Sequence, residues 1–404
     1  MISKEYEVVI VGGGMVGLSI AHQLLERGKT TKICILEKEI ELGKHSSGRN
    51  SGVLHAGIYY EPNSLKAKVC ISGSKRLKSW ISEKKLSINN CGKLIIPQRV
   101  DLDSQLDFLA ERGKQNGAVV QMIDNNQIKQ IAPFASSKTG RGLWSPNTSV
   151  CNPKEILLTL EKELIERNVH IFKGVLIDEV NQIEKKIKLN DSNYIHYGYL
   201  YNSAGLHADK VAKKFEIGSN YKLVPFRGSY WQLRKDSPFD VTTNLYPVPD
   251  LNVPFLGVHF TPTWDSKTVT IGPTATFAFG RENYEFHKGI EPLAAINNFS
   301  ILVNQYLSDS NGMRKYFNEQ AFLSFKALMI KDAKQLIPSL ESAHVVTSKK
   351  VGIRPQLFNL EKQKLEDDFV CIVKDSSTHV LNAISPAFTA SFSLADLIID
   401  KSRI

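Results

Sequence analysis

The chain has 404 residues, 42% hydrophobic and 23% charged, an ordinary composition for a globular protein long enough for two domains. The formal net charge is +10, which fits binding to an anionic membrane surface or to an anionic substrate. The lysines are spread out and not clustered with aromatic residues, so nucleic acid is not an expected partner. No apolar run reaches the ~18–20 residues of a membrane span, and five scattered cysteines argue against a disulfide framework or a zinc site.

The first predicted elements form a β-α-β unit. Residues 6–11 (YEVVIV) are a continuous apolar run, as expected for a strand buried on both faces. Residues 15–27 have helical spacing, and residues 32–36 (KICIL) form the next strand. A loop rich in Ser, Gly and Asn follows at 43–57, before a helix predicted at 64–84.

The rest of the chain predicts a nucleotide-binding domain interrupted by a β-rich insertion. The further predictions are strands at 91–97, 169–180 and 197–202, helices at 104–117 and 153–167, a strand-rich region at 221–290, a helical region at 291–337 and a final helix at 388–400. We therefore assign residues 1–85, 145–215 and 345–404 to the nucleotide-binding domain, and residues 86–144 and 216–344 to a substrate-binding or cap domain.

A G-x-G-x-x-G motif lies between the first strand and the first helix. Gly12 permits the tight turn, Gly14 lets the backbone approach a pyrophosphate, and Gly17 packs the helix against the strand. The pyrophosphate is expected at the helix N-terminus, beside Met15 and Val16. Glu37 follows the second strand, where a carboxylate accepts hydrogen bonds from an adenosine ribose and disfavours NADP.

The loop after Glu37 favours FAD over NAD. It offers hydroxyls, an amide and a guanidinium to the phosphates and ribityl chain of a long cofactor, from Ser46, Ser47, Arg49, Asn50 and Ser51. Later candidate cofactor contacts are Lys38, Val175, Ala204, Gly205, Asp209, Gly352 and Arg354, although Ala204-Gly205 also fits an ordinary strand-to-helix turn.

Small residues precede the final helix, where a helix N-terminus would approach the flavin pyrimidine and stabilise its anionic reduced form. The alternative is an ordinary capped helix start. The candidate residues are Asn382, Pro386, Ala387, Phe388 and Thr389.

Longer blocks carry a resemblance to a known family. LHAGIYYEPNSLKAKVC, CGKLIIP, LVPFRGSYWQL, NLYPVPDLNVPFLGVHFTP, TIGPTATFAFGRENY and HVLNAISPAFTAS resemble the L-2-hydroxyglutarate oxidase/dehydrogenase family of the D-amino-acid-oxidase-type superfamily, over about residues 8–398. The resemblance implies an α/β fold, with a Rossmann-like FAD-binding domain of the glutathione-reductase type and an inserted β-rich α+β substrate domain. It also implies oxidation of L-2-hydroxyglutarate to 2-oxoglutarate, with electrons passed to a quinone or to dioxygen.

Such an oxidation needs a substrate Cα–H facing flavin N5 and a base that takes the hydroxyl proton. His55, in the loop near the flavin, and His259, in GVHFTP of the inserted domain, are the candidate bases. The choice between them stays open, and each could instead be a hydrogen-bonded structural histidine.

The substrate is a dicarboxylate, so carboxylate-binding groups are also expected. A guanidinium offers a bidentate fork, and Arg227, Arg281 and Arg354 are the candidates, with a structural ion pair as the alternative for each. Tyr59, Tyr60 and Tyr246 are candidate hydroxyl donors or core aromatics. No Asp/His pair has metal-ligand spacing, so we predict no metal.

Two other functions remain open: another FAD enzyme of the superfamily, such as a glycerol-3-phosphate or amino-acid oxidoreductase, and a flavin-binding subunit without turnover. The N-terminus enters a strand without a signal-peptide pattern. We expect a cytoplasmic protein, with peripheral contact at the inner face of the cytoplasmic membrane as an open alternative.

Overall fold

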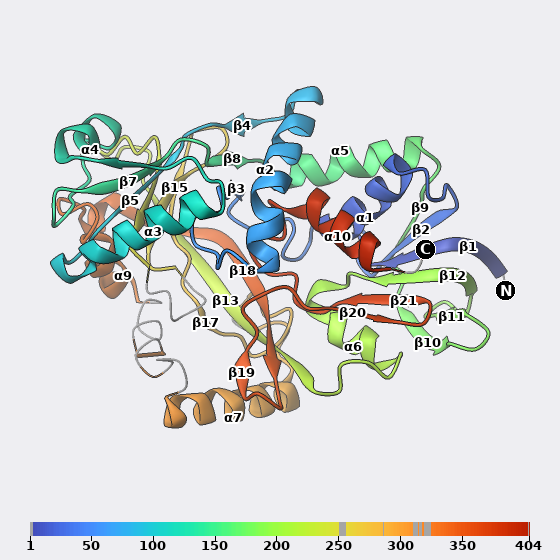
Figure 1. Cartoon of the computed structure of the whole chain (residues 1–404). Coiled ribbons are helices and arrows are strands. Elements are labelled where there is room, and N and C mark those ends of the chain that lie inside the picture. The colour runs from blue at the N-terminus through green and yellow to red at the C-terminus, as the bar shows by residue number, and fades with distance from the viewer. Residues whose placement is uncertain are drawn as a thin grey trace.

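A computed structural model of the chain describes residues 3–249, 256–285, 287–309, 314, 317–318, 325–402 and 404. In Figure 1 both chain ends lie on the right, in the half that contains α1, α5 and α10, and the half on the left contains α3, α4 and α9. The long strands β13 (Tyr221–Leu233) and β18 (Val345–Asn359) run between the two halves.

The first sheet places its central strands in the parallel order β21-β12-β1-β2-β9, with antiparallel strands β10, β11 and β20 beside them. This is the Rossmann-like order that the glycine motif predicts. The strands are β1 (Ser3–Val11), β2 (Ile33–Glu37), β9 (His170–Lys173), β10 (Ile177–Asn181), β11 (Lys186–Leu189), β12 (Tyr194–Asn202), β20 (Cys371–Lys374) and β21 (Ser377–Val380).

Helices cover both faces of this sheet. Alternate residues of β1 point to opposite faces: Val8 and Ile10 pack with α1 (Met15–Glu26), α2 (Leu65–Glu83), α5 (Pro153–Glu166) and α10 (Ser391–Lys401), whereas Val9 and Val11 pack with α6 (Ala208–Lys213). The start of α2 is fixed by Ser64, whose side chain accepts a hydrogen bond from the amide of Ala67. Apolar burial on both faces explains the continuous apolar runs of β1 and β2.

The second sheet is mostly antiparallel and follows the order β19-β18-β13-β16-β15-β14-β5-β7-β6, with β17 beside β13. Helices α3 (Asp103–Gln115), α4 (Asn125–Ile131) and α9 (Lys326–Ala333) pack on it, and α7 (Pro292–Ser308) packs near β13 and β18. The remaining strands are β5 (Lys93–Ile96), β6 (Gln121–Ile123), β7 (Gly142–Ser145), β14 (Asn244–Pro247), β15 (His259–Pro262), β16 (Val269–Gly272), β17 (Thr276–Phe277) and β19 (Lys364–Leu365), and a small third sheet contains β3 (Val53–Leu54), β8 (Ser149–Cys151) and β4 (Ile88–Asn89).

Two details differ from the sequence prediction. The strand predicted over 169–180 is two strands, because Gly174 adopts φ 73° and turns the chain, so that β9 and β10 lie at opposite ends of the sheet order. The sequence pattern predicts that residues from 345 onward belong to the nucleotide-binding domain. In the structure, β18 pairs with β13 along nearly its whole length, so residues 345–359 belong to the second sheet. The other predicted domain limits stay predictions. Part of the helical region predicted at 291–337 lies outside the described residues.

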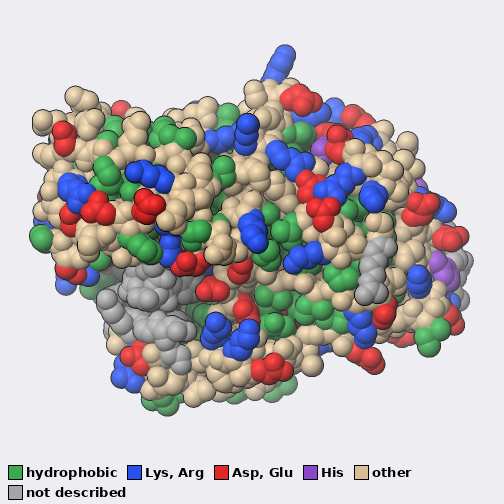
Figure 2. All heavy atoms as spheres, viewed as in Figure 1, with side chains coloured by type: hydrophobic (Ala, Val, Ile, Leu, Met, Phe, Trp, Pro, Cys, Tyr) green, Lys and Arg blue, Asp and Glu red, His purple; other side chains and the backbone are tan. Residues whose placement is uncertain are grey.

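Charges are mixed on the face in Figure 2, where Lys and Arg side chains alternate with Asp and Glu and form no continuous basic patch. Among the helices of the described residues, none combines the length and the hydropathy that crossing a bilayer requires.

Candidate active site

The glycine turn between β1 and α1 leaves no room for side chains. Gly12 has φ 103°, and a Cβ on it would lie 2.6 Å from the carbonyl oxygen of Ser203; a Cβ on Gly17 would lie 2.0 Å from the carbonyl oxygen of Gly12. The first helical amide, of Met15, donates to Ser47 Oγ at 2.9 Å. The N-terminus of α1 therefore faces the serine-rich loop, in the arrangement that binds phosphates.

Glu37 ends β2 beside this turn. Its carboxylate accepts hydrogen bonds from the amides of Gly13 at 2.8 Å and Glu39 at 2.9 Å. These bonds fix the carboxylate at the turn, and each oxygen retains a lone pair for a ribose hydroxyl. A Cβ on Gly14 would lie 2.9 Å from Ser47 Oγ, so the turn also packs tightly against the serine-rich loop.

The loop from 46 to 51 is held by its own hydrogen bonds and by β18. The side-chain amide of Asn50 donates to the carbonyl oxygens of Ser46 at 3.2 Å and Ser47 at 2.7 Å. Ser46 Oγ donates to the carbonyl oxygen of Ile353 at 3.0 Å. The loop thus joins the two halves of the molecule.

A cavity of about 650 Å³ lies between this loop, the segment before α10 and the second sheet, a size typical of small-ligand sites. Most of the residues predicted from the sequence line it. They are Met15, Val16, Ser46, Ser47, Arg49, Asn50, Ser51, His55, Tyr59, Tyr60, Tyr246, His259, Gly352, Arg354, Pro386, Ala387, Phe388 and Thr389.

Other predicted cofactor residues lie outside the lining. Gly12, Gly14, Gly17 and Glu37 form the turn beside it, and Ala204, Gly205 and Val175 lie on neighbouring backbone, as do Lys38, Asp209 and Asn382. The side-chain amide of Asn382 donates to the carbonyl oxygen of Asp368 at 2.6 Å, and the Lys38 ammonium pairs with Glu282 at 2.7 Å. Both side chains therefore bind other groups of the protein, and their observed contacts are structural.

Arg281 and Asp209 bind each other. The guanidinium donates to both carboxylate oxygens, at 2.5 and 2.8 Å, and to the carbonyl oxygen of Leu206 at 2.5 Å. The pair is buried, and Arg281 lowers the pKa of the Asp209 carboxyl against the raising effect of burial. The predicted substrate role of Arg281 and the predicted cofactor role of Asp209 do not fit this position, which is outside the cavity.

Arg227 also faces away from the cavity. Its strand neighbours Phe226 and Gly228 line the cavity, and side chains alternate along a strand. Its guanidinium instead donates to the carbonyl oxygen of Tyr284 at 3.1 Å. The alternation of β13 therefore separates Arg227 from the predicted substrate site.

His55 is a half-buried imidazole in the cavity wall. Its Nε2 lies 3.2 Å from Ser385 Oγ, and within the described part of the chain its buried Nδ1 has no hydrogen-bond partner. Burial, and then the positive charge of Lys93, lower the His55 pKa well below its usual range. The ring is therefore neutral at physiological pH, and one of its two nitrogens carries a lone pair.

His259 is neutral as well. Its Nδ1 lies 2.8 Å from the carbonyl oxygen of Gly257; because a carbonyl only accepts, Nδ1 carries the proton and Nε2 the lone pair. The ring stacks on Tyr246 with centroids 3.9 Å apart, and burial lowers its pKa to about 3.

The sequence prediction missed several residues at the cavity. The Lys66 ammonium, near the Tyr60 ring, donates to the carbonyl oxygen of Asp367, and burial followed by Arg354 lowers its pKa to about 7. Lys66 gave no sequence signal, because a lysine in the first turn of a helix is ordinary. Other charged or polar residues of the lining that the prediction missed include Glu61, Arg112, Tyr230, Asp367, Asp368 and Ser385.

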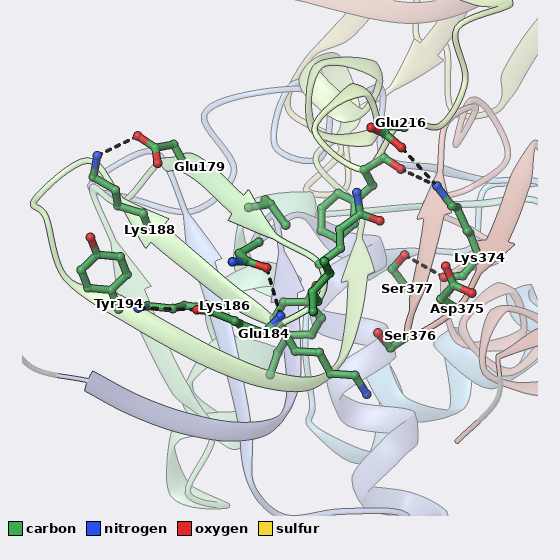
Figure 3. Close-up of a pocket in the computed structure, with 17 residues that line it drawn as sticks. Glu179, Glu184, Lys186, Lys188, Tyr194, Glu216, Lys374, Asp375, Ser376 and Ser377 are labelled. Carbon is green, nitrogen blue, oxygen red and sulfur yellow. Dashed lines mark hydrogen bonds and ion pairs between the residues drawn. The ribbon is translucent and has the colours of Figure 1, made fainter.

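A second hollow, of about 860 Å³, lies on the far edge of the first sheet (Figure 3). It is larger, but its charged groups bind one another: Lys188 pairs with Glu179 at 2.8 Å, and Lys374 donates to the carbonyl oxygen of Phe215 at 3.1 Å. None of its lining side chains has a buried polar atom without a hydrogen-bond partner among the described residues, so this hollow is a weaker candidate site.

One metal-like cluster occurs among the described residues, formed by Glu39, His45 and Glu282. The Lys38 ammonium already pairs with both carboxylates, and His45 Nδ1 lies 2.8 Å from the Tyr284 hydroxyl. A lysine thus supplies the positive charge that a metal would bring.

Residues 7–401 match the family model described as FAD dependent oxidoreductase (DAO). The chain is 35% identical to the mitochondrial L-2-hydroxyglutarate dehydrogenase of Nematostella vectensis, covering 99% of this chain and 91% of that one. It is 34% identical to the L-2-hydroxyglutarate dehydrogenase of Indibacter alkaliphilus, with 98% of each chain covered.

Solved structures share the fold at lower identity. FAD-bound L-α-glycerophosphate oxidase from Mycoplasma pneumoniae superposes with a TM-score of 0.76 at 20% identity, covering 98% of this chain and 94% of that one. Glycine oxidase from Geobacillus kaustophilus gives 0.72 at 14% identity, with the same coverage.

Proposed function

The chain belongs to the FAD dependent oxidoreductase (DAO) family, and we propose that it oxidises L-2-hydroxyglutarate to 2-oxoglutarate. The observation that carries this proposal is His55, a neutral imidazole whose buried Nδ1 has no hydrogen-bond partner among the described residues, in a cavity that also contains Arg354 and Lys66. A base beside cations is what the oxidation of an anionic hydroxy acid requires.

The residues of the first sheet fit FAD. The glycine turn would hold the pyrophosphate, Glu37 the adenosine ribose, and the 46–51 loop the ribityl chain, because Glu37 and Ser47 both accept hydrogen bonds from amides of this turn. When bound, FAD accepts the hydride that leaves the substrate carbon.

His55 would take the substrate hydroxyl proton. If its Nε2–H donates to Ser385 Oγ, the lone pair lies on Nδ1, the nitrogen without a partner among the described residues. His259 offers a second lone pair on Nε2. Both rings are neutral, so neither must lose a proton before it acts.

Arg354 would bind a substrate carboxylate. Replacing it with alanine is expected to raise KM about 10- to 100-fold, the value of one to two charge-assisted hydrogen bonds, and to change the limiting rate of flavin reduction much less. Stopped-flow reduction over a range of L-2-hydroxyglutarate concentrations separates the two constants. An unchanged KM removes Arg354 from the substrate site.

A panel of reductants tests the proposed substrate against the other functions. The flavin of the purified protein is expected to be reduced by L-2-hydroxyglutarate and not by sn-glycerol 3-phosphate or L-glutamate. Faster reduction by either of the latter would assign the protein to another activity of the superfamily, and no reduction by any of them favours a subunit without turnover.

The reduced enzyme would pass its electrons to a quinone or to dioxygen, and a quinone calls for contact with a membrane. Exposed apolar residues on one face of α7 support peripheral contact at the inner face of the cytoplasmic membrane: Leu293 is 80% exposed, Ile296 67% and Leu307 66%. An apolar helix face of this kind inserts into a bilayer surface, and the net charge of +10 favours anionic lipid.

Replacing both Leu293 and Ile296 with glutamate is expected to abolish most co-sedimentation with vesicles of phosphatidylcholine and phosphatidylglycerol. Flavin reduction in solution should stay unchanged, because neither residue lines the cavity. Ile183→Glu is the matched control, since this isoleucine is 96% exposed in the turn between β10 and β11 of the first sheet. A wild-type protein that stays in the supernatant with these vesicles contradicts the membrane contact.

A further inference from the structure

Lys93 is a buried lysine that the chemistry above does not use. Its side chain is 1% exposed, and its ammonium nitrogen lies 4.2 Å from the centroid of the Tyr246 ring and 5.1 Å from that of the Tyr59 ring. Both tyrosines line the cavity, and Lys93 lies directly behind this part of its wall. Lys93 pairs in register with Asn244, two residues before Tyr246, so the strand pair directs Lys93 and Tyr246 to the same face.

No counter-charge for Lys93 is present among the described residues. No carboxylate contacts its ammonium there, and the groups that offset burial are the thiols of Cys70 and Cys91. Burial raises the pKa of both thiols, that of Cys70 to about 12, so they are uncharged at neutral pH. A buried ammonium without a counter-charge is costly, which indicates that an anionic ligand binds at the wall that Tyr59 and Tyr246 form beside it.

A second group of cations surrounds the same cavity. Arg354 and Lys66 both line it, next to Tyr60. His55 interacts with both groups of cations. On the side of Arg354 and Lys66, Ser385 hydrogen-bonds His55 Nε2 and also interacts with the Tyr60 hydroxyl. On the other side, the positive charge of Lys93 lowers the pKa of the His55 ring. Two cationic groups around one base match a ligand with two carboxylates and a hydroxyl between them.

We propose that Lys93 determines the specificity for dicarboxylates by binding the carboxylate remote from the reacting carbon. Arg354 would hold the nearer carboxylate. Arg354 lies on β18, two residues after Gly352, where a Cβ would be 2.9 Å from the carbonyl oxygen of Arg49 in the cofactor loop. Arg354 is therefore near the cofactor loop, whereas Lys93 lies on β5, farther along the same sheet. This inference rests on the proposed function, because it assigns the two ends of its substrate.

Lys93→Met removes the charge and keeps the length of the side chain. The kcat/KM for L-2-hydroxyglutarate is expected to fall about 10- to 100-fold, the value of a charge-assisted hydrogen bond. The kcat/KM for L-2-hydroxybutyrate, which lacks the remote carboxylate, should stay within about threefold, well below a tenfold change. Lys93→Arg, which keeps a positive charge, should recover part of the preference for the dicarboxylate.

Lys186→Met is the matched control. The Lys186 ammonium also lies 4.2 Å from a tyrosine ring centroid, that of Tyr194, but at the second hollow on the edge of the first sheet (Figure 3). Its selectivity should equal that of the wild type. Equal losses for both substrates in Lys93→Met, or no loss for L-2-hydroxyglutarate, would overturn the assignment of Lys93.

Thermal unfolding gives a readout that does not depend on turnover. Without substrate, Lys93→Met is expected to unfold at a higher temperature than the wild type at pH 7, because it lacks the unpaired buried charge. A lower unfolding temperature would identify Lys93 as a structural residue and overturn the proposal.

The difference in unfolding temperature should shrink as the pH rises. Burial lowers the folded-state pKa of Lys93 from 10.5 to about 7, so the destabilisation is complete below pH 7 and disappears as the pH approaches the unfolded-state pKa. The titratable groups that face Lys93 are His55, His259, Cys70, Cys91, Tyr59 and Tyr246.

Failure of this inference can be told apart from failure of the proposed function. If L-2-hydroxyglutarate reduces the wild-type flavin and Lys93→Met shows the same substrate preference, the Lys93 assignment alone is wrong. If L-2-hydroxyglutarate does not reduce the wild-type flavin, the proposed function is wrong. The binding of glutarate, measured by the change in flavin absorbance, then tests Lys93 separately, and equal affinity in wild type and Lys93→Met overturns its role.

Discussion

Replacing His55 with alanine is expected to slow anaerobic flavin reduction by L-2-hydroxyglutarate about 10²- to 10⁴-fold, the usual contribution of a positioned base. Burial and Lys93 keep the imidazole neutral, and its Nδ1 has no partner among the described residues. FAD content should stay near that of the wild type, because the backbone amide of residue 55, which donates to Thr389 Oγ1 at 3.2 Å, is retained.

The same stopped-flow measurement on His259→Ala decides between the two imidazoles. His259 stacks on Tyr246 and uses Nδ1 to hold the carbonyl oxygen of Gly257, so it is both a candidate base and a support for the cavity wall. The larger loss in reduction rate at saturating substrate identifies the base. Wild-type reduction rates in both variants would exclude both histidines.

Replacing Arg281 with methionine is expected to lower the free energy of unfolding by about 3–5 kcal/mol, because it leaves a buried carboxylate without its partner. Asp209 is 2% exposed and accepts both hydrogen bonds from Arg281. Denaturant unfolding measures the loss. The KM of the folded fraction should stay unchanged, since neither residue lines the cavity.

A double variant separates a lost ion pair from lost packing. Adding Asp209→Leu to Arg281→Met removes both charges and should recover most of the lost stability. If the double variant is as unstable as the single one, packing of the Arg281 side chain explains the loss. A raised KM in the folded single variant would instead support the predicted role of Arg281 in substrate binding.

The cofactor half was predictable because its signals are local. A buried parallel strand needs a continuous apolar run, and a pyrophosphate turn needs glycines at fixed spacing; both requirements appear within residues 6–17. Their outcome in the structure is the β1–α1 turn, where a Cβ on Gly12 or Gly17 would collide with backbone.

The substrate half was less predictable because its side chains meet through strand pairing. Arg227 stands among apolar residues, as a ligand-binding arginine would, but only the register of β13 shows that it faces away from the cavity. Arg281 and Asp209 are 72 residues apart in the chain, so their pairing could not be read from either motif. Lys93 carries the same signal as Arg227, a charge within an apolar strand (KLII), and only the pairing of β5 with β14 places it beside Tyr246.

Anaerobic mixing with L- and D-2-hydroxyglutarate in parallel tests the central claim most directly. The L enantiomer is expected to bleach the visible flavin band and to yield one 2-oxoglutarate per flavin, while the D enantiomer leaves the band unchanged on the same timescale. Bleaching by both enantiomers at equal rates, or by neither, would contradict the claim that this cavity oxidises L-2-hydroxyglutarate.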